Sequence, residues 1–366
     1  MAHNIQRKAD VRRVGAQQAP VRRHGGGARP EPAKAPGWNP AEFVQMHLAF
    51  APARILGTAL ELDLFSHEAD GKRTAKDVSD TAGASERGTR MILDALVGMG
   101  MLTRHGDRYA LAEPARRFFV RGRPEYMGDF ISMHQLWEGW SHLTEIVRTG
   151  KPHTPVEQQA VAEEFFPKLI RGLHVVNTEP ARRTAEALGI GAKAGGLRVL
   201  DVACGSGIWG IAMAEAHPQA HVTAHDFPGV LEVTREFLER HGVKDRFDFL
   251  PGDLKTVEFG EARFDIALLG NIVHSEGERS SRDLLRRIFR ALLPGGRIAI
   301  ADMIPNDSRT GPVFPLIFAL NMLVNTESGD TYTLVEYQQW LTEAGFARVS
   351  TVDIGSHSPL IVGHKR

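Results

Sequence analysis

The feature of this sequence that most constrains its fold is an apolar strand that runs directly into a glycine-rich turn. Residues 197–202 are mostly apolar, as in a parallel strand covered on both faces of its sheet. The chain then continues through Gly205, Gly207 and Gly210, which allow a tight turn and let the backbone approach a ligand closely. The segment therefore predicts a strand, a loop and a helix that bind a small ligand at the carboxyl end of the strand.

Further strand candidates follow this unit, and helical stretches such as 281–293 separate them. Strands that alternate with helices predict a parallel, doubly wound α/β sheet of the Rossmann-like kind, with its ligand at the carboxyl edge. Residues 347–354 and 359–362, joined by a short polar turn, predict a terminal antiparallel hairpin. The other expected strands are residues 221–225, 247–250, 264–269 and 297–301.

The rest of the chain divides into three predicted parts, ahead of an α/β domain at 191–366. Residues 1–37 are rich in Arg, Ala, Gly and Pro without an apolar period, and they predict a disordered tail. Residues 38–120 show helical apolar spacing, then a helix, a turn, a second helix and a small hairpin, which is the pattern of a winged-helix domain. Residues 121–190 predict further helices, whose aromatic side chains are candidates to roof a ligand pocket.

A winged helix can bind DNA or serve as a packing and dimerisation module. The first turns of its second helix offer only Arg87 and Arg90 to the phosphates of DNA. Lys and Arg together number 44, as do Asp and Glu, and this balance argues against a dedicated nucleic-acid binder. We therefore expect a dimerisation domain, without nucleic acid as a partner.

Composition also bears on compartment and metal chemistry. Cys204 is the single cysteine, which excludes a disulfide framework and a multi-cysteine metal cluster. No apolar run approaches the roughly 18 residues of a membrane span, and the N-terminus lacks the apolar core of a secretory signal. We expect a cytoplasmic protein without a membrane partner and without a metal, because no dense ligand motif supports His274 with Asp302 or His357 as a metal site.

Two ligand classes fit the glycine-rich turn. The spacing of its glycines, with Asp226 roughly 20 residues further on, matches the fingerprint of a dinucleotide site, so a nicotinamide-dependent oxidoreductase is one alternative. Asp201, however, stands four residues before the first glycine, where it suits a ligand with an ammonium group and no pyrophosphate. A second acidic turn at 251–254 could accept an adenine amino group, and together with the terminal hairpin it favours a different nucleoside ligand.

Taken together, these features resemble the class I S-adenosylmethionine-dependent methyltransferases. The resemblance is closest to the small-molecule O-methyltransferase family of plant caffeate and flavonoid enzymes and bacterial polyketide and hydroxyindole enzymes. It spans roughly residues 40–365, and Asp226-Phe227-Pro228-Gly229-Val230 is its most characteristic stretch. The other matching motifs are Leu200-Asp201-Val202-Ala203-Cys204-Gly205-Ser206-Gly207, Pro251-Gly252-Asp253 and Leu293-Pro294-Gly295-Gly296-Arg297.

The resemblance implies S-adenosyl-L-methionine as the cofactor and a homodimer formed through the N-terminal winged-helix domain. It also implies a role for each matching residue at the strand ends. Asp201, Gly205 and Gly207 are predicted to contact the methionine moiety, and Asp226 the ribose. Asp253 and Leu254 are predicted to contact the adenine. Phe227 and Asn271 are predicted to contact the remainder of the cofactor.

Methyl transfer to a hydroxyl group also removes a proton, which calls for a general base near the acceptor. The fourth predicted strand runs into His274 and delivers it to the carboxyl edge of the sheet, beside the expected cofactor. The family carries its catalytic histidine here, usually within a His-Asp-Trp segment, so the resemblance makes His274 the base. In this chain Ser275-Glu276 replaces the Asp-Trp pair, and Gly270 stands where many plant members have a cofactor-contacting lysine.

In the plant enzymes a second carboxylate orients the histidine. Glu276 and Asp330 are the candidates for this catalytic role in the present sequence. The alternative interpretation is that His274 only caps the following helix or fills a gap in the packing.

A predicted apolar helix at 316–326 supplies candidates for the substrate pocket. Asn321 and Asn325, four residues apart, share one helical face and could bond the oxygens of an acceptor. Met322 could pack on an aromatic ring, whereas core packing with satisfied amides is the alternative for this face. The preceding helices add three further candidates to the pocket, Trp137, Phe166 and Leu169.

The sequence thus predicts methyl transfer from S-adenosylmethionine to a small molecule, with a hydroxyl of an aromatic or polyketide-like metabolite as the first hypothesis for the acceptor. A nitrogen or carbon acceptor that His274 only orients is the second hypothesis. A non-catalytic dimeric regulator that senses the cofactor is a third, from a different class of protein.

Overall fold

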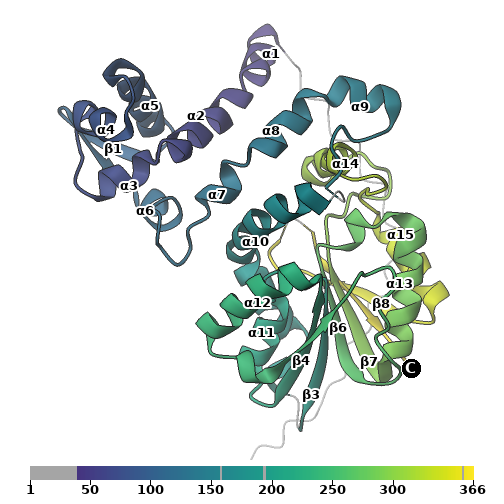
Figure 1. Cartoon of the computed structure of the whole chain (residues 1–366). Coiled ribbons are helices and arrows are strands. Elements are labelled where there is room, and N and C mark those ends of the chain that lie inside the picture. The colour runs from purple at the N-terminus through teal and green to yellow at the C-terminus, as the bar shows by residue number, and fades with distance from the viewer. Residues whose placement is uncertain (1–38, 157–158, 193–194, 357) are drawn as a thin grey trace, which may run out of the picture. The chain divides into compact units, whose positions relative to one another are not determined.

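The computed structural model describes residues 39–156, 159–192, 195–356 and 358–366 (Figure 1). The predicted tail at 1–37 lies outside the described residues, as does His357. The chain divides into two compact units, Met1–Ala49 and Phe50–Arg366. In the first unit, helix α1 (Pro40–His47) begins at a capping box formed by Asn39 and Glu42, and it buries none of its side chains.

The second unit opens with the predicted succession of helix, turn, helix and hairpin. Thr74 and Ser85 accept hydrogen bonds from the first turns of two helices, and Gly106-Asp107 forms the two-residue turn of the hairpin. Leu93, Leu96 and Tyr109 lie in the small core between these elements, so the winged-helix pattern is confirmed. The elements are α2 (Phe50–Glu61), α3 (Leu64–Ala69), α4 (Ala75–Ala82), α5 (Glu86–Gly98), β1 (Leu102–His105) and β2 (Arg108–Leu111).

Helices also connect this region to the α/β fold, as predicted. The longest is α10 (Gln159–Ala187), which contains Pro167 and Pro180 and packs against the helix that follows the glycine-rich turn. The shorter elements are α6 (Glu113–Phe118), α7 (Gly128–Ile131), α8 (His134–Ser141), α9 (Leu143–Thr149) and the 3-10 turn η1 (Ile190–Ala192).

The α/β fold contains a sheet whose strand order over the described residues is β5-β4-β3-β6-β7-β9-β8. The first five strands in this order are parallel, and β9 lies antiparallel between β7 and β8, so the doubly wound sheet and the terminal hairpin are both confirmed. The chain order reverses between β3 and β6, which is the switch point where such sheets bind ligands. The strands are β3 (Leu197–Val202), β4 (Ala220–Asp226), β5 (Phe247–Pro251), β6 (Phe264–Gly270), β7 (Leu292–Ala301), β8 (Ala347–Val352) and β9 (Leu360–His364).

Helices cover both faces of this sheet, and an apolar core lies on each side (Figure 1). On one face α10, α11 (Ile208–Ala216) and α12 (Pro228–His241) bury the first core, and on the other α13 (Gly277–Ala291) and α15 (Leu334–Ala344) bury the second. The remaining elements are α14 (Val313–Asn325), η2 (Lys244–Arg246) and η3 (Val273–Ser275). Among the described residues, no helix combines the length and the apolar character required to cross a bilayer.

Candidate active site

Polar side chains gather where the parallel strands end. Asp201 is the second-last residue of β3, and Asp226 is the last residue of β4. Asn271 directly follows β6, and Asp302 directly follows β7. Because the strands run parallel, their carboxyl ends meet at one edge of the sheet. The structure therefore brings together side chains that are up to about a hundred residues apart in the sequence.

Asp201 is completely buried and incompletely bonded. Its Oδ2 accepts a hydrogen bond of 2.8 Å from the backbone N–H of Gly210, while its Oδ1 has no hydrogen-bond partner among the described residues. Burial raises the pKa of Asp201 to about 8. A buried carboxylate oxygen without a donor is costly, so this site fits a ligand that brings a positively charged donor, such as the ammonium of a methionine moiety.

The glycine-rich turn is fastened to the end of β4. Oδ2 of Asp226 accepts the backbone N–H of Gly205 at 2.9 Å, and its Oδ1 accepts that of Phe227 at 2.8 Å. Gly205 and Gly207 both have positive φ, at 55° and 77°, and a Cβ on Gly207 would lie 3.0 Å from Thr234. Burial raises the pKa of Asp226 to about 6, so two acidic groups with raised pKa values flank this turn.

The other predicted cofactor residues lie around this edge with different degrees of exposure. Phe227 begins α12 with an exposed ring, and Asp253 is exposed, with Oδ1 accepting the N–H of Lys255. Leu254 is buried in the core beneath β5. Asn271 has a φ of 60°, and its amide donates to Asn177 of α10 at 3.3 Å. The assignment of these four residues to the cofactor stays a prediction.

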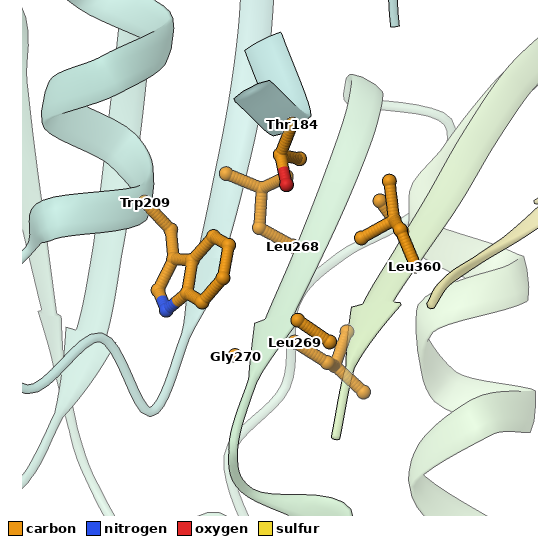
Figure 2. A pocket seen from close by; sticks show the side chains of 8 residues that line it. Thr184, Trp209, Leu268, Leu269, Gly270 and Leu360 are labelled. Carbon is orange, nitrogen blue, oxygen red and sulfur yellow. The ribbon is translucent and has the colours of Figure 1, made fainter. Parts of the chain in front are cut away.

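The indole of Trp209 explains the glycine at the end of β6. A Cβ on Gly270 would lie 2.0 Å from Nε1 of Trp209, so no larger residue fits without moving the indole. Figure 2 shows the two side by side, with Thr184 of α10 and Leu268 lining the same apolar pocket. The lysine of many plant members therefore has no room here.

His274 is buried in η3, directly beside Asp302. Its Nδ1 lies 2.5 Å from Oδ1 of Asp302, and its backbone N–H donates to Oδ2 at 3.1 Å. Because the carboxylate accepts the Nδ1 proton, Nε2 is the unprotonated nitrogen of the neutral ring. Nε2 receives no hydrogen bond from the described residues, and the edge of Phe318 packs against the ring at 4.9 Å between centroids. This arrangement presents an oriented imidazole that can accept a proton.

The carboxylate that contacts the imidazole is Asp302, whereas Glu276 and Asp330 bond to other groups, so a catalytic role of these two residues stays a prediction. Glu276 accepts a hydrogen bond from Ser280 at the start of α13. Asp330 uses its carboxylate on the N–H of Thr331, and only its backbone N–H reaches the carbonyl of His274. β6 and β7 are neighbours in the sheet, so the residue that follows β7 lies beside the loop after β6.

Comparison with known proteins places this site in a family. Residues 140–347 match the O-methyltransferase domain, and residues 44–121 match the O-methyltransferase dimerisation domain. The chain belongs to the O-methyltransferase family. Methyl transfer from S-adenosylmethionine, predicted from the strand-end motifs, is thereby confirmed, and the nicotinamide-dependent and non-catalytic alternatives are set aside.

Individual relatives extend over most of this methyltransferase. It is 31% identical over 333 residues to the tetracenomycin polyketide synthesis 8-O-methyltransferase TcmO of Streptomyces glaucescens, covering 89% of this chain and 97% of TcmO. It is 29% identical to the N,N-dimethyltransferase OxyT of Streptomyces rimosus, over 83% and 90% of the two chains. Human N-acetylserotonin methyltransferase, solved with S-adenosylmethionine, shares the fold with a TM-score of 0.78 at 23% identity, covering 90% and 99% of the chains.

The asparagines predicted to form the substrate wall do share one face of α14. The amide nitrogen of Asn325 donates to the side-chain oxygen of Asn321 at 3.2 Å, and Nε1 of Trp140 donates to the same oxygen at 3.1 Å. Part of their bonding capacity is therefore satisfied within the protein, as in the core-packing alternative. Met322 is also buried.

The aromatic candidates from the preceding helices are placed differently. Trp137 is 46% exposed and packs near Phe50, so Trp140 is the tryptophan that contacts α14. Phe166 and Leu169 are partly buried in a small cluster that includes Phe165. Whether Trp137, Phe166 and Leu169 contact a substrate stays a prediction.

Sequence reasoning missed several residues that the methyltransferase fold brings to this edge. The sequence indicates Asp302 only as a candidate metal ligand, and it does not single out Tyr337, Phe318 or Asn177. Asn177 stands three residues after His174, so the two residues share one face of α10. In the structure, Nδ1 of His174 lies 3.0 Å from the hydroxyl of Ser206 in the glycine-rich turn. This face of α10 therefore lies beside the switch point of the sheet.

Proposed function

We propose that this methyltransferase methylates a hydroxyl group of an aromatic, polyketide-like metabolite, with His274 as the general base. The observation that carries the proposal is the oriented imidazole of His274, held through Nδ1 by Asp302. The similarity to TcmO, whose name describes O-methylation in the synthesis of a polyketide, supports this class of acceptor.

Asp201, Gly205, Gly207 and Asp226 are the residues we expect to hold the cofactor. The unpartnered, buried Oδ1 of Asp201 supports this assignment, because it suits an ammonium group. S-adenosylmethionine supplies an activated methyl group on a sulfonium, so the chemical work of the protein is to align the acceptor and to exclude water.

In this proposal, His274 removes the proton of the acceptor hydroxyl. Its Nε2 takes the hydroxyl proton as the acceptor oxygen becomes nucleophilic, and the ring then carries a positive charge. The Nδ1 proton stays between the ring and Asp302, whose negative charge stabilises the imidazolium. Phe318 packs against the ring in a T-shaped contact and restricts its rotation.

We place the acceptor against α14, with the face of Asn321, Met322 and Asn325 as one wall. The amide nitrogen of Asn321 and the side-chain oxygen of Asn325 make no hydrogen bond to the described residues. The amide could donate to an acceptor oxygen, and the oxygen could accept from an acceptor hydroxyl. Trp137, Phe166 and Leu169 are the proposed contributions of residues 121–190.

The test is a screen with S-adenosylmethionine that carries a labelled methyl group. Hydroxylated aromatic polyketides and matched aromatic amines serve as acceptors, and the position of the label is determined by mass spectrometry and NMR. We expect label on a phenolic oxygen. Label on nitrogen alone would establish the second candidate, which the similarity to the N,N-dimethyltransferase OxyT favours, and a failure to label either set would remove this substrate class.

We also propose a cytoplasmic homodimer. The match of residues 44–121 to a dimerisation domain supports it, as does α1, which buries no residue and exposes more than half of Phe43, Val44 and Met46 in the single chain. We assign dimerisation to residues 38–120, part of the pocket to 121–190 and catalysis to 191–366. Sedimentation of the purified protein at micromolar concentration tests the dimer, since a stable monomer would contradict it.

A further inference from the structure

The pair of His274 and Asp302 has a third member. The phenol of Tyr337 donates a hydrogen bond of 2.8 Å to Oδ2 of Asp302, and Tyr337 is fully buried. The two residues are 35 positions apart, so only the packing of α15 on the sheet brings them together. Burial and the adjacent Asp302 raise the pKa of Tyr337 well above its usual value, so its hydroxyl remains a donor across the working pH range.

Packing around α15 holds this phenol in place. α15 begins at a capping box formed by Thr333 and Glu336, and Tyr337 and Trp340 belong to its buried face. The ring of Tyr337 lies 6.2 Å from that of Tyr332 and 5.9 Å from that of Trp340, between centroids. A ring packed in this way has little freedom to turn, so the hydroxyl stays on Asp302.

Asp302 is consequently saturated with donors. From the described residues it accepts hydrogen bonds from the ring and the backbone of His274, from the backbone of Met303 and from the phenol of Tyr337. The phenol and the imidazole bond to different oxygens of this carboxylate, and they therefore compete for its negative charge.

We propose that Tyr337 is a positioning residue that sets the lower end of the pH range in which His274 acts as the base, an inference that rests on the proposed function. Negative charge on Asp302 favours the protonated imidazole. The phenol withdraws part of this charge, so the imidazolium is stabilised less and Nε2 stays free to accept a proton at lower pH.

The remaining ionisable groups around the phenol do not bypass this route. Tyr332, Asp330, Glu278 and Glu336 influence the two tyrosines electrostatically. Glu336 is occupied by the capping box and by Arg309. Asp330 turns its carboxylate to a backbone N–H. A change at the hydroxyl of Tyr337 therefore reaches His274 through Asp302.

The experiment measures kcat/KM against pH for the full chain and for Tyr337→Phe, which removes only the hydroxyl. We expect the acidic limb to move to higher pH by about 0.5 to 1 unit, the effect of one lost hydrogen bond to a buried carboxylate. We expect the plateau to stay within about threefold of the parent. A limb that does not move, or that moves to lower pH, overturns the proposal, and so does an equal loss of rate at every pH.

Tyr332→Phe is the matched control. Tyr332 is also buried, and its ring packs against Trp340 of α15. Its hydroxyl makes no hydrogen bond to the described residues. Its loss should leave the acidic limb in place. The same shift in both variants would mean that packing, and not the bond to Asp302, sets the limb, which also overturns the proposal.

Two further measurements separate this inference from the identity of the base and from folding. The NMR signal of the Nδ1 proton of His274, assigned by its absence in His274→Ala, should move downfield in Tyr337→Phe whatever the turnover is. If that shift occurs while His274→Ala remains active, the base fails and the network stands. Replacing the chain's four tyrosines by 3-fluorotyrosine makes each phenol a stronger donor, so the limb should move to lower pH even if Tyr337→Phe does not fold. An unmoved signal in Tyr337→Phe or an unmoved limb with 3-fluorotyrosine overturns the proposal.

Discussion

Asp201 and Asp302 are both buried carboxylates at the carboxyl edge of one sheet, yet the protein surrounds them differently. Within the described residues, Asp201 receives one hydrogen bond, from Gly210, and its Oδ1 has no partner. Asp302 receives hydrogen bonds on both oxygens, from His274, Met303 and Tyr337. The first carboxylate lacks donors that a ligand can bring, and the second already has a complete set from the protein.

We expect this difference to separate the carboxylates that bind the cofactor from the carboxylate that positions His274. A buried carboxylate that the fold leaves incomplete is stabilised only when a ligand supplies the missing donors. A carboxylate that the fold completes can hold a side chain in one orientation, as Asp302 holds His274. Asp226 accepts one backbone N–H on each oxygen. We group it with Asp201 because burial raises its pKa to about 6 and it lies beside the glycine-rich turn. Variants of the two sets should therefore affect different measured quantities.

The largest effect should come from the residue that Asp302 serves. His274→Ala removes the proposed base, so we expect turnover to fall roughly 100-fold or more. The affinity for S-adenosylhomocysteine, measured by calorimetry, should change less than about twofold, because His274 lies outside the set that includes Asp201. Normal turnover in this variant would contradict the assignment.

Asp302→Asn keeps the shape but replaces an acceptor by a donor on one side. We expect a loss of turnover of about 10- to 100-fold, because the tautomer and orientation of the imidazole are no longer fixed. Cofactor affinity should again be preserved. Glu276→Gln and Asp330→Asn are the comparison, and losses from them that equal the loss from Asp302→Asn would restore them as the orienting carboxylates.

Asp226→Ala should show the opposite behaviour. We expect it to weaken S-adenosylhomocysteine binding about 10-fold or more, since hydrogen bonds to a charged group are lost, while turnover at saturating cofactor changes little. Asp248→Ala is the matched control, because Asp248 is an exposed carboxylate on the neighbouring strand that pairs with His221. Unaltered affinity in Asp226→Ala would remove it from the cofactor site.

The last prediction is a pH dependence that comes from Asp201. With a pKa near 8, Asp201 is mostly protonated at pH 7, and a bound ammonium lowers this pKa, so binding should release a proton. Affinity for S-adenosylhomocysteine should then rise with pH from about 6 to 8, by at most about tenfold per unit.

Calorimetry in buffers of different ionisation enthalpy measures the released proton. Asp201→Asn should abolish the release, and 5′-methylthioadenosine, which lacks the ammonium, should bind without it. Equal proton release with both ligands would show that Asp201 does not face the ammonium.

The sequence by itself determined the sheet, its terminal hairpin and the acidic strand ends at Asp201 and Asp226. These features are local: Asp201 and the Gly210 that it bonds are nine residues apart, and the glycines needed for positive φ stand inside the same short segment. Short-range patterns of this kind are legible because backbone sterics and apolar periodicity act over a few residues.

Only the tertiary structure decided what surrounds His274. The register that pairs Gly270 of β6 with Ala301 of β7 places Asp302 next to His274, although 28 residues separate them. Tyr337 arrives from a helix packed on that face of the sheet, and Trp140 reaches Asn321 across 181 residues. Such contacts depend on which strands are neighbours and on how helices pack. No local spacing encodes either, so the sequence alone did not indicate Asp302 as the carboxylate on the imidazole.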